Sequence, residues 1–103
     1  MEQDIRWKQR FANFEKALLF LKSGCEQTSW TQLEEAGIVQ AFEFSFELAW
    51  KTLKDYLHQK GVFSQFPRDL IKDGFQLQIL KDGATWLKML DKRNELSHTY
   101  NQT

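Results

Sequence analysis

Apolar residues recur at helical spacing along almost the whole of this 103-residue chain, and this pattern constrains the fold more than any other feature. The first stripe, at intervals of four, three, four and three residues, runs through Trp7, Phe11, Phe14, Leu18 and Leu21, which places these side chains on one face of a helix. The chain has one proline and little of the alternation that marks strands. It is therefore predicted to be all-α.

Start and stop signals divide the chain into about four helices. The first extends from about residue 4 to residue 23 and stops at Gly24. The second begins near Thr31, where Glu34 three residues later is expected to complete a capping box, and it ends before residue 61.

The third helix starts at Pro67, because proline suits the first helical turn. It carries Leu70, Ile71, Phe75 and Leu77, and its apolar pattern extends to Ile79 and Leu80. An Asp82-Gly83 turn or cap precedes the last helix, which starts near residue 84. Antiparallel helices joined by short loops predict an up-and-down bundle, and we assign residues 1–103 to a single domain.

The second helix carries two apolar faces. The main one includes Ile38, Phe42, Phe46, Ala49 and Leu53, and the opposite one includes Ala41, Phe44, Ser45, Leu48 and Thr52. A helix with this pattern is central to its bundle or packs on another subunit, which favours a homodimer. A polar stripe separates the two faces and is interpreted as solvated, with pairs four residues apart: Glu47, Lys51, Lys54 and His58.

Charge and cysteine content narrow the class of protein. Fourteen basic and fourteen acidic residues give a formal net charge of zero, which argues against holding long nucleic acid by bulk electrostatics. Cys25 is the single cysteine, no signal peptide is recognised at the N-terminus, and no apolar run approaches the ~20 residues that span a bilayer. We expect a cytoplasmic protein with no membrane association.

One octapeptide near the C-terminus carries most of the functional information: Arg93-Asn94-Glu95-Leu96-Ser97-His98-Thr99-Tyr100. Arg93 falls within the apolar stripe of the last helix, where an unpaired charge is costly. It must therefore pair with a carboxylate or line an opening. Glu43 and Glu47 are the candidate partners, and Glu35 is a further alternative.

Asn94 and His98 lie one turn apart along a neighbouring edge of the same helix. Arg93 and His98 are about 140° apart around its axis, so they can flank a cleft but do not point at one spot unaided. A facing copy of the helix would help both to meet one phosphate, which again predicts a two-fold dimer. Taken singly, an arginine, a histidine or a terminal tyrosine is commonly structural; the combination, with Asn94 and Ser97 between, is what indicates a site.

Other chemistry is sparse in the sequence. The five glycines are scattered and form no phosphate loop, and neither histidine has metal-ligand spacing. No close Asp-x-Asp pair is present to hold magnesium for nucleotidyl transfer. We predict no metal site and no cofactor, and we do not expect the chain to transfer nucleotides alone.

The octapeptide resembles the Arg-x4-His-x-Tyr signature of the HEPN superfamily. The whole chain is similar to its branch of nucleotidyltransferase substrate-binding proteins, through residues 42–54, the Pro67-Arg68-Asp69 helix start and the Trp86–Leu90 segment that runs into the motif. The resemblance implies a dimeric helical bundle that binds a separate small nucleotidyltransferase. Related chains continue past the tyrosine into a further helix, whereas this sequence ends at Thr103; a longer chain and completion by a partner both remain open.

Three functions follow as expectations. The first is a non-catalytic subunit that binds a substrate or nucleotide for the partner enzyme through Arg93, Asn94, Ser97 and His98. The second, implied by related toxin–antitoxin pairs, is a metal-independent RNase in which Arg93 and His98 act on the RNA backbone and the partner silences the toxin by adenylylating Tyr100. The third is an ordinary bundle that serves as a dimerisation module.

Overall fold

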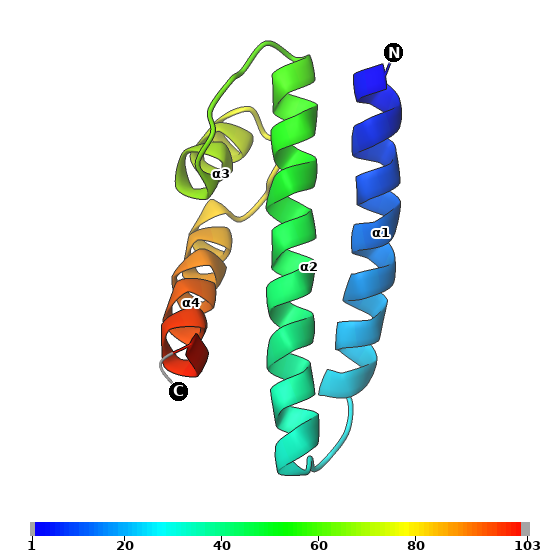
Figure 1. The fold of residues 1–103 in the computed structure, drawn as a ribbon. Coiled ribbons are helices and arrows are strands. Elements are labelled where there is room, and N and C mark those ends of the chain that lie inside the picture. Colours follow the sequence, from blue (N-terminus) through cyan, green and yellow to red (C-terminus); the bar gives the residue numbers. More distant parts are fainter. Residues whose placement is uncertain (1, 102–103) are drawn as a thin grey trace.

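The computed structural model is all-α, as the periodicity predicts. The chain folds into four helices: α1 (Glu2–Cys25), α2 (Gln32–Gln59), α3 (Pro67–Gln76) and α4 (Gly83–Asn101) (Figure 1). The structure describes the backbone of residues 2–101 and the side chains of residues 5–97, and no strand occurs in that part of the chain.

The helices are arranged around α2, the longest of them. Figure 1 shows α1 on one side of α2 and both α3 and α4 on the other, with α1 and α4 each antiparallel to α2. Contacts join α1 to α2, α2 to α3 and α4, and α3 to α4. Over the described residues the backbones of α1 and α4 do not approach each other closely, so the predicted antiparallel bundle is open between these two helices.

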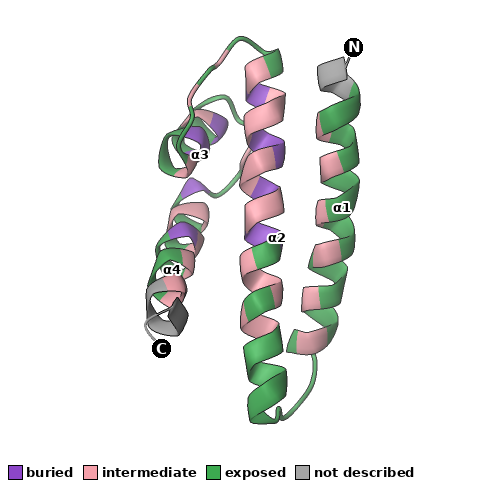
Figure 2. Cartoon of the chain, viewed as in Figure 1, coloured by how far each residue is buried: buried purple, intermediate pink, exposed green. Residues whose placement is uncertain are grey.

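The core lies where α3 and α4 pack on the C-terminal half of α2. One cluster contains the buried residues Phe46, Ile71 and Leu90, and a second contains Leu53, Leu57 and Leu70. Figure 2 shows the same distribution, since the buried positions of α2 are concentrated in the half that faces α3 and the start of α4.

Side-chain caps define two of the helix starts. Thr31 caps α2 in a complete capping box with Glu34, as predicted, and the hydrogen bonds from the backbone and then the side chain of Thr31 lower the pKa of Glu34. Asp82 precedes α4 and accepts hydrogen bonds from the Thr85 hydroxyl at 2.6 Å and the Thr85 N–H at 3.1 Å. These two bonds, the hydroxyl's first, lower the pKa of Asp82.

Two predicted helix ends are wrong. α1 continues through Gly24, where a Cβ atom would lie 3.2 Å from Cγ1 of Ile38; this glycine therefore permits close approach of α2 rather than ending the helix. α3 ends at Gln76, before the predicted apolar extension. The Leu77 N–H donates to the Asp73 carbonyl at 2.9 Å, and Gln78 adopts a positive φ of 63°, which a helix does not accommodate.

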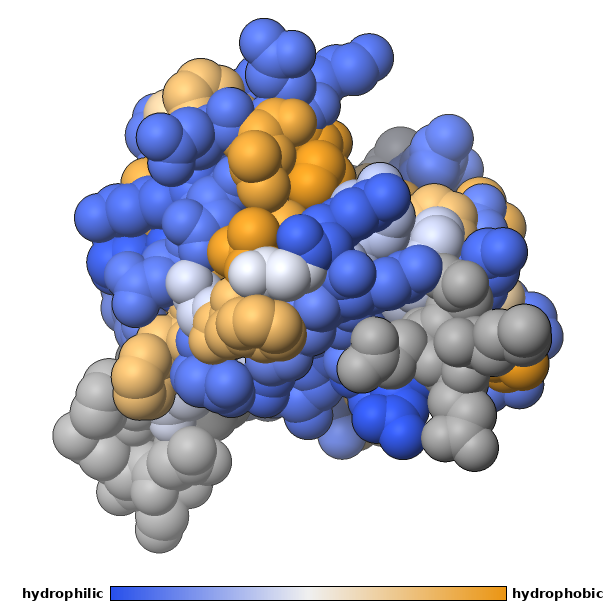
Figure 3. Space-filling view, turned by 90° about the horizontal axis from the view of Figure 1, so that it is seen from above, coloured by the Kyte–Doolittle hydropathy of each residue, from blue (hydrophilic) through white to orange (hydrophobic). Residues whose placement is uncertain are grey.

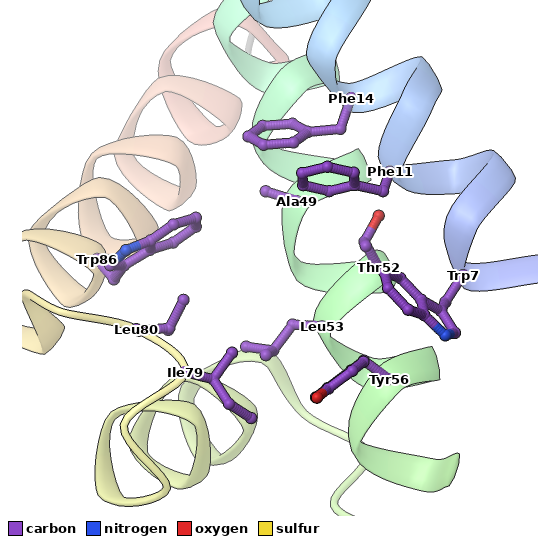
Figure 4. A pocket seen from close by; sticks show the side chains of 10 residues that line it. All are labelled: Trp7, Phe11, Phe14, Ala49, Thr52, Leu53, Tyr56, Ile79, Leu80 and Trp86. Atoms are coloured by element: carbon purple, nitrogen blue, oxygen red, sulfur yellow. The ribbon is translucent and has the colours of Figure 1, made fainter. Parts of the chain in front are cut away.

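An apolar cleft of about 250 Å³ occupies the space between α1, α2 and the start of α4. Figure 4 shows Phe11 and Phe14 of α1 on one side of it, Trp86 of α4 and Leu80 on the other, with α2 between them. The predicted stripe of α1 does face α2, but 43% of Phe11 remains exposed because α4 does not close over it.

The connection from α2 to α3 presents two exposed rings, Phe63 and Phe66, at one end of the molecule. His58 Nε2 lies 3.0 Å from the Ser64 carbonyl, and the Ser64 hydroxyl donates to Asp73 at 2.5 Å, which ties this connection to both helices. Viewed from the same end, hydrophobic residues gather in the middle of the surface and hydrophilic residues surround them (Figure 3).

Candidate functional site

Arg93 reaches the junction of α2 and α4 because the helical periodicity of α4 carries it there. Leu90, less than one turn earlier, is buried in the core at 3% exposure, and Trp86 and Met89 pack against the same cluster. The next residue on that face is Arg93, whose side chain is 23% exposed. An arginine at this position is held by the packing of its helix and keeps limited access to solvent.

The carboxylate that Arg93 meets belongs to Glu47. Nη1 of Arg93 lies 3.6 Å from Oε2 of Glu47, whose side chain is 37% exposed. An ion pair at this distance and exposure contributes about 0–1 kcal/mol. Nε of Arg93 is buried and has no hydrogen-bond partner among the residues whose side chains are described.

Glu43, one turn earlier on α2, contacts a different residue. The Ser97 hydroxyl donates to Oε2 of Glu43 at 3.2 Å. Since α2 and α4 are antiparallel, the Arg93–Glu47 and Ser97–Glu43 contacts lie one turn apart on both helices. The two carboxylates predicted to support the motif thus lie opposite it; their role in function stays a prediction.

Glu47 is also the centre of a larger cluster. Trp50 donates from Nε1 to Oε2 at 3.0 Å, and Nζ of Lys51 lies 3.3 Å from Oε1. The Glu47–Lys51 pair, four residues apart, confirms this part of the predicted solvated stripe, since the two side chains are 37% and 43% exposed. The same carboxylate also lies near Arg93 of α4.

Arg93 lines an open groove of about 580 Å³ between α2 and α4. The other residues that line it come from α2 and are Ala36, Val39, Gln40, Glu43, Phe44 and Glu47. Phe44 is 61% exposed and brings an aromatic ring to the groove. The predicted alternatives for Arg93, pairing with a carboxylate and lining an opening, therefore occur together.

The side chains of the remaining motif residues are described only in part. Asn94 is exposed. His98 and Tyr100 belong to the last turns of α4, but their side chains lie outside the described residues. Whether an imidazole meets the Arg93 guanidinium stays a prediction.

Sequence reasoning missed Trp50, Lys51 and Phe44 as neighbours of the motif. The sequence did hold a signal for them, because all three lie within about one turn of Glu47, a predicted partner of Arg93.

No group of three His, Cys, Asp or Glu side chains is placed to hold a metal ion, as far as the described side chains extend. Among the described helices none is both long enough and apolar enough to cross a bilayer.

Two comparisons relate this chain to known proteins. A relative from Haemophilus influenzae named "Probable ribonuclease HepT" is 32% identical over 72 residues, which cover 65% of this chain and 49% of the relative. The chain thus spans about half the length of the curated relative it matches. Residues 9–103 match the family described as "Nucleotidyltransferase substrate binding protein like". This match covers nearly the whole sequence and confirms the resemblance read from residues 42–54 and 93–100: the chain belongs to the nucleotidyltransferase substrate binding protein like family.

Proposed function

We propose that this chain is the binding subunit of a two-component nucleotidyltransferase and holds a phosphate of a nucleotide or of RNA at Arg93. The observation that carries the proposal is the position of Arg93 in the groove between α2 and α4, with 23% of its side chain exposed. A guanidinium presents a planar fork of donors that matches phosphate oxygens. Partial burial strengthens that interaction relative to one at an open surface.

The polar residues that follow Arg93 complete the proposed site. Ser97 lies one turn further along the side of α4 that faces α2, and its hydroxyl can donate to a phosphate oxygen if it leaves Glu43. Asn94 and His98 would approach from the neighbouring edge of the helix. The nucleotidyl-transfer chemistry is assigned to a separate small nucleotidyltransferase, in keeping with the family description and with a sequence that has no Asp-x-Asp pair.

A binding measurement tests the phosphate site. Arg93→Ala is expected to weaken binding of ATP or of a short single-stranded RNA by about tenfold or more, because one bidentate charged contact is lost. Arg93→Lys should retain part of the affinity, since it keeps the charge and loses the fork. Unchanged affinity in a folded Arg93→Ala protein would exclude this site.

The partner is tested by co-purification. The chain, co-expressed with a small nucleotidyltransferase from the same genome, is expected to elute with that enzyme as one complex. Failure to associate with any such enzyme would contradict the two-component proposal. The binding measurement on Arg93→Ala would still test the phosphate site, because it does not require the partner enzyme.

A second candidate function is a metal-independent ribonuclease, and the named relative favours it. In this mechanism His98 would act as general acid or base in cleavage of the RNA backbone, and Arg93 would stabilise the charge on the scissile phosphate. RNA cleavage in the presence of a chelator, lost in His98→Ala and in Arg93→Ala, would support it. Cleavage that persists in both variants would exclude this chemistry.

Tyr100 links the two candidates, because the resemblance to toxin–antitoxin pairs implies that the partner enzyme adenylylates the matched tyrosine. Transfer of AMP from ATP to the phenol oxygen would release pyrophosphate and leave an adenylylated Tyr100. Mass spectrometry of the chain after incubation with the transferase and ATP is expected to show the added adenylate, and Tyr100→Phe should lack it. Absence of the adduct in the unaltered protein would remove this link.

We also propose that the chain acts as a homodimer. A second open groove runs between α1 and α2, and it shares Gln40 and Phe44 with the groove at Arg93. Phe20, which lines it, is 72% exposed, and a second copy would cover this surface. Sedimentation analysis should give a dimer that Phe20→Glu dissociates; a monomeric unaltered chain would contradict this part of the proposal.

A further inference from the structure

Three donor groups converge on one carboxylate at the junction of α2 and α4. The Lys51 ammonium lies 3.3 Å from one Glu47 oxygen. The Trp50 indole donates at 3.0 Å to the other oxygen, which is also the one 3.6 Å from the Arg93 guanidinium. Two cations and an N–H donor around a single oxyanion form the kind of environment that a phosphate requires.

We propose that the Glu47 carboxylate occupies the place of the phosphate in the unliganded protein, and that Lys51 and Trp50 are further phosphate donors beside Arg93. This inference rests on the proposed function, in which Arg93 holds the phosphate. It adds a regulatory role for Glu47 as an internal competitor. It also assigns a role in binding to Lys51, whose side chain is 43% exposed on the solvated stripe that the sequence pattern indicated.

The contacts of Glu47 suit a group that can be displaced. Its distance of 3.6 Å from Arg93 exceeds the ~2.7–2.9 Å of a well-formed charge-assisted hydrogen bond. The Glu47 side chain is 37% exposed and Lys51 is 43% exposed, so solvent can receive the displaced carboxylate. Rotation about the side-chain bonds of Glu47 would clear the position without moving either helix.

Arg93 gives a second observation in support of this exchange. Its side chain keeps 23% of its surface exposed and lines the groove between α2 and α4. Its Nε is buried, so the terminal nitrogens of the guanidinium are the donors that a phosphate in the groove would meet. One of these nitrogens, Nη1, is the atom that now lies 3.6 Å from Glu47.

The charges predict the direction of the effect. With Glu47 in place, the cluster of Arg93, Lys51 and Glu47 carries a net charge of +1, and the carboxylate repels an incoming phosphate. Glu47→Gln removes that repulsion and keeps the size of the side chain. If Glu47 instead served to hold Arg93 in a binding position, the same substitution would weaken phosphate binding, so the sign of the change distinguishes the two roles.

The experiment measures binding of ATP and of a short single-stranded oligouridylate to the folded full chain, each as a separate arm. Glu47→Gln is expected to tighten binding roughly three- to tenfold, and Lys51→Ala to weaken it by a similar factor. In the RNA arm Lys51→Ala should also reduce the slope of log affinity against log salt by about one. The matched controls are Glu35→Gln in the first turn of α2 and Lys72→Ala on the exposed side of α3, which should leave both affinities unchanged.

The outcomes separate this inference from the proposed function. Tightening in the ATP arm alone identifies a nucleotide phosphate, and tightening in the RNA arm alone identifies a phosphodiester; either result supports the inference. If Arg93→Ala weakens binding while Glu47→Gln weakens it or leaves it unchanged, the competitor role is overturned and the phosphate site stands. If Arg93→Ala has no effect in either arm, the proposed function itself fails. Circular dichroism of each variant verifies that it is folded.

Discussion

Ser97 of α4 donates a hydrogen bond of 3.2 Å to the carboxylate of Glu43 on α2, one turn from the contact between Arg93 and Glu47. The two contacts join residues 54 and 46 positions apart in the sequence, so they form only when α4 lies antiparallel along α2. They define the rotation of α4 about its axis at the groove.

Removal of the Ser97 hydroxyl tests this relationship. Ser97→Ala is expected to lower the free energy of unfolding by about 0.5–1.5 kcal/mol, the usual net contribution of one hydrogen bond. Urea denaturation measures the change, and Ser29→Ala in the exposed α1–α2 connection is the control that should be nearly neutral. In a double-mutant cycle with Glu43→Gln, additive effects would show that the two side chains do not interact in solution.

Truncation of Leu57 tests the location of the core. Leu57 has no exposed surface and packs with Leu53 and Leu70, so Leu57→Ala should destabilise the protein by about 2–5 kcal/mol through lost burial and the cavity left behind. Leu33→Ala on the same helix is the matched control. Leu33 is 83% exposed, and its truncation should change stability by less than about 0.5 kcal/mol. Equal effects of the two substitutions would contradict the packing of α3 on α2.

Two helical glycines are expected to respond to alanine in opposite directions. A Cβ atom on Gly74 would lie 3.1 Å from Cδ1 of Leu80 and 3.2 Å from Cδ2 of Leu53, so crowding on both sides should make Gly74→Ala destabilising by about 1 kcal/mol or more. Gly37 in α2 has nothing within 4 Å of the same position, and Gly37→Ala should stabilise by about 0.5–1 kcal/mol. Thermal unfolding of both variants measures the difference, and a stabilised Gly74→Ala protein would show that α3 packs more loosely than described.

The capping box at the start of α2 makes a pH-dependent contribution to stability. Hydrogen bonds from Thr31 lower the pKa of Glu34 below its ordinary value of 4.5 in the folded chain. The unfolded chain therefore binds this proton at a higher pH than the folded chain does. The contribution is fully present above about pH 4.5 and is lost as the pH falls through the lower, folded pKa.

NMR titration of the Glu34 carboxyl is expected to give a pKa below that of Glu34 in an unfolded peptide. Glu34→Gln is the matched variant, because glutamine can still accept from the Thr31 backbone but does not titrate over this range. The acid dependence of stability should therefore be weaker in Glu34→Gln than in the unaltered chain. Identical acid dependence in the two proteins would show that the capping carboxylate does not contribute.

The helices were predictable because their signals are local. Thr31 and Glu34 mark the start of α2 and Pro67 marks the start of α3, because each of these residues acts within one turn of backbone. The end of α1 was misread because Gly24 serves a contact with Ile38, which belongs to another helix. The end of α3 depends on the turn at Gln78, which adopts a positive φ. Glycine is the usual sequence signal for such a backbone conformation, and position 78 is not a glycine.

The candidate site was predictable only in part. The sequence indicated that Arg93 needs a carboxylate or an opening and named three carboxylates, but the choice among them depends on how α2 and α4 are rotated against each other. The same rotation brings Lys51 and Trp50 to Glu47. The functional roles of Arg93, Asn94, Ser97, His98 and Tyr100, and the assignment of residues 1–103 to a single domain, stay predictions.

The sequence by itself determined the helical class, most helix boundaries and the family, because periodicity, caps and a short motif are encoded in neighbouring residues. Only the tertiary structure decided that Glu47 meets Arg93 and that α1 and α4 stand apart on opposite sides of α2. Those features depend on how whole helix faces pack, which is a balance of many weak contacts between residues distant in the chain.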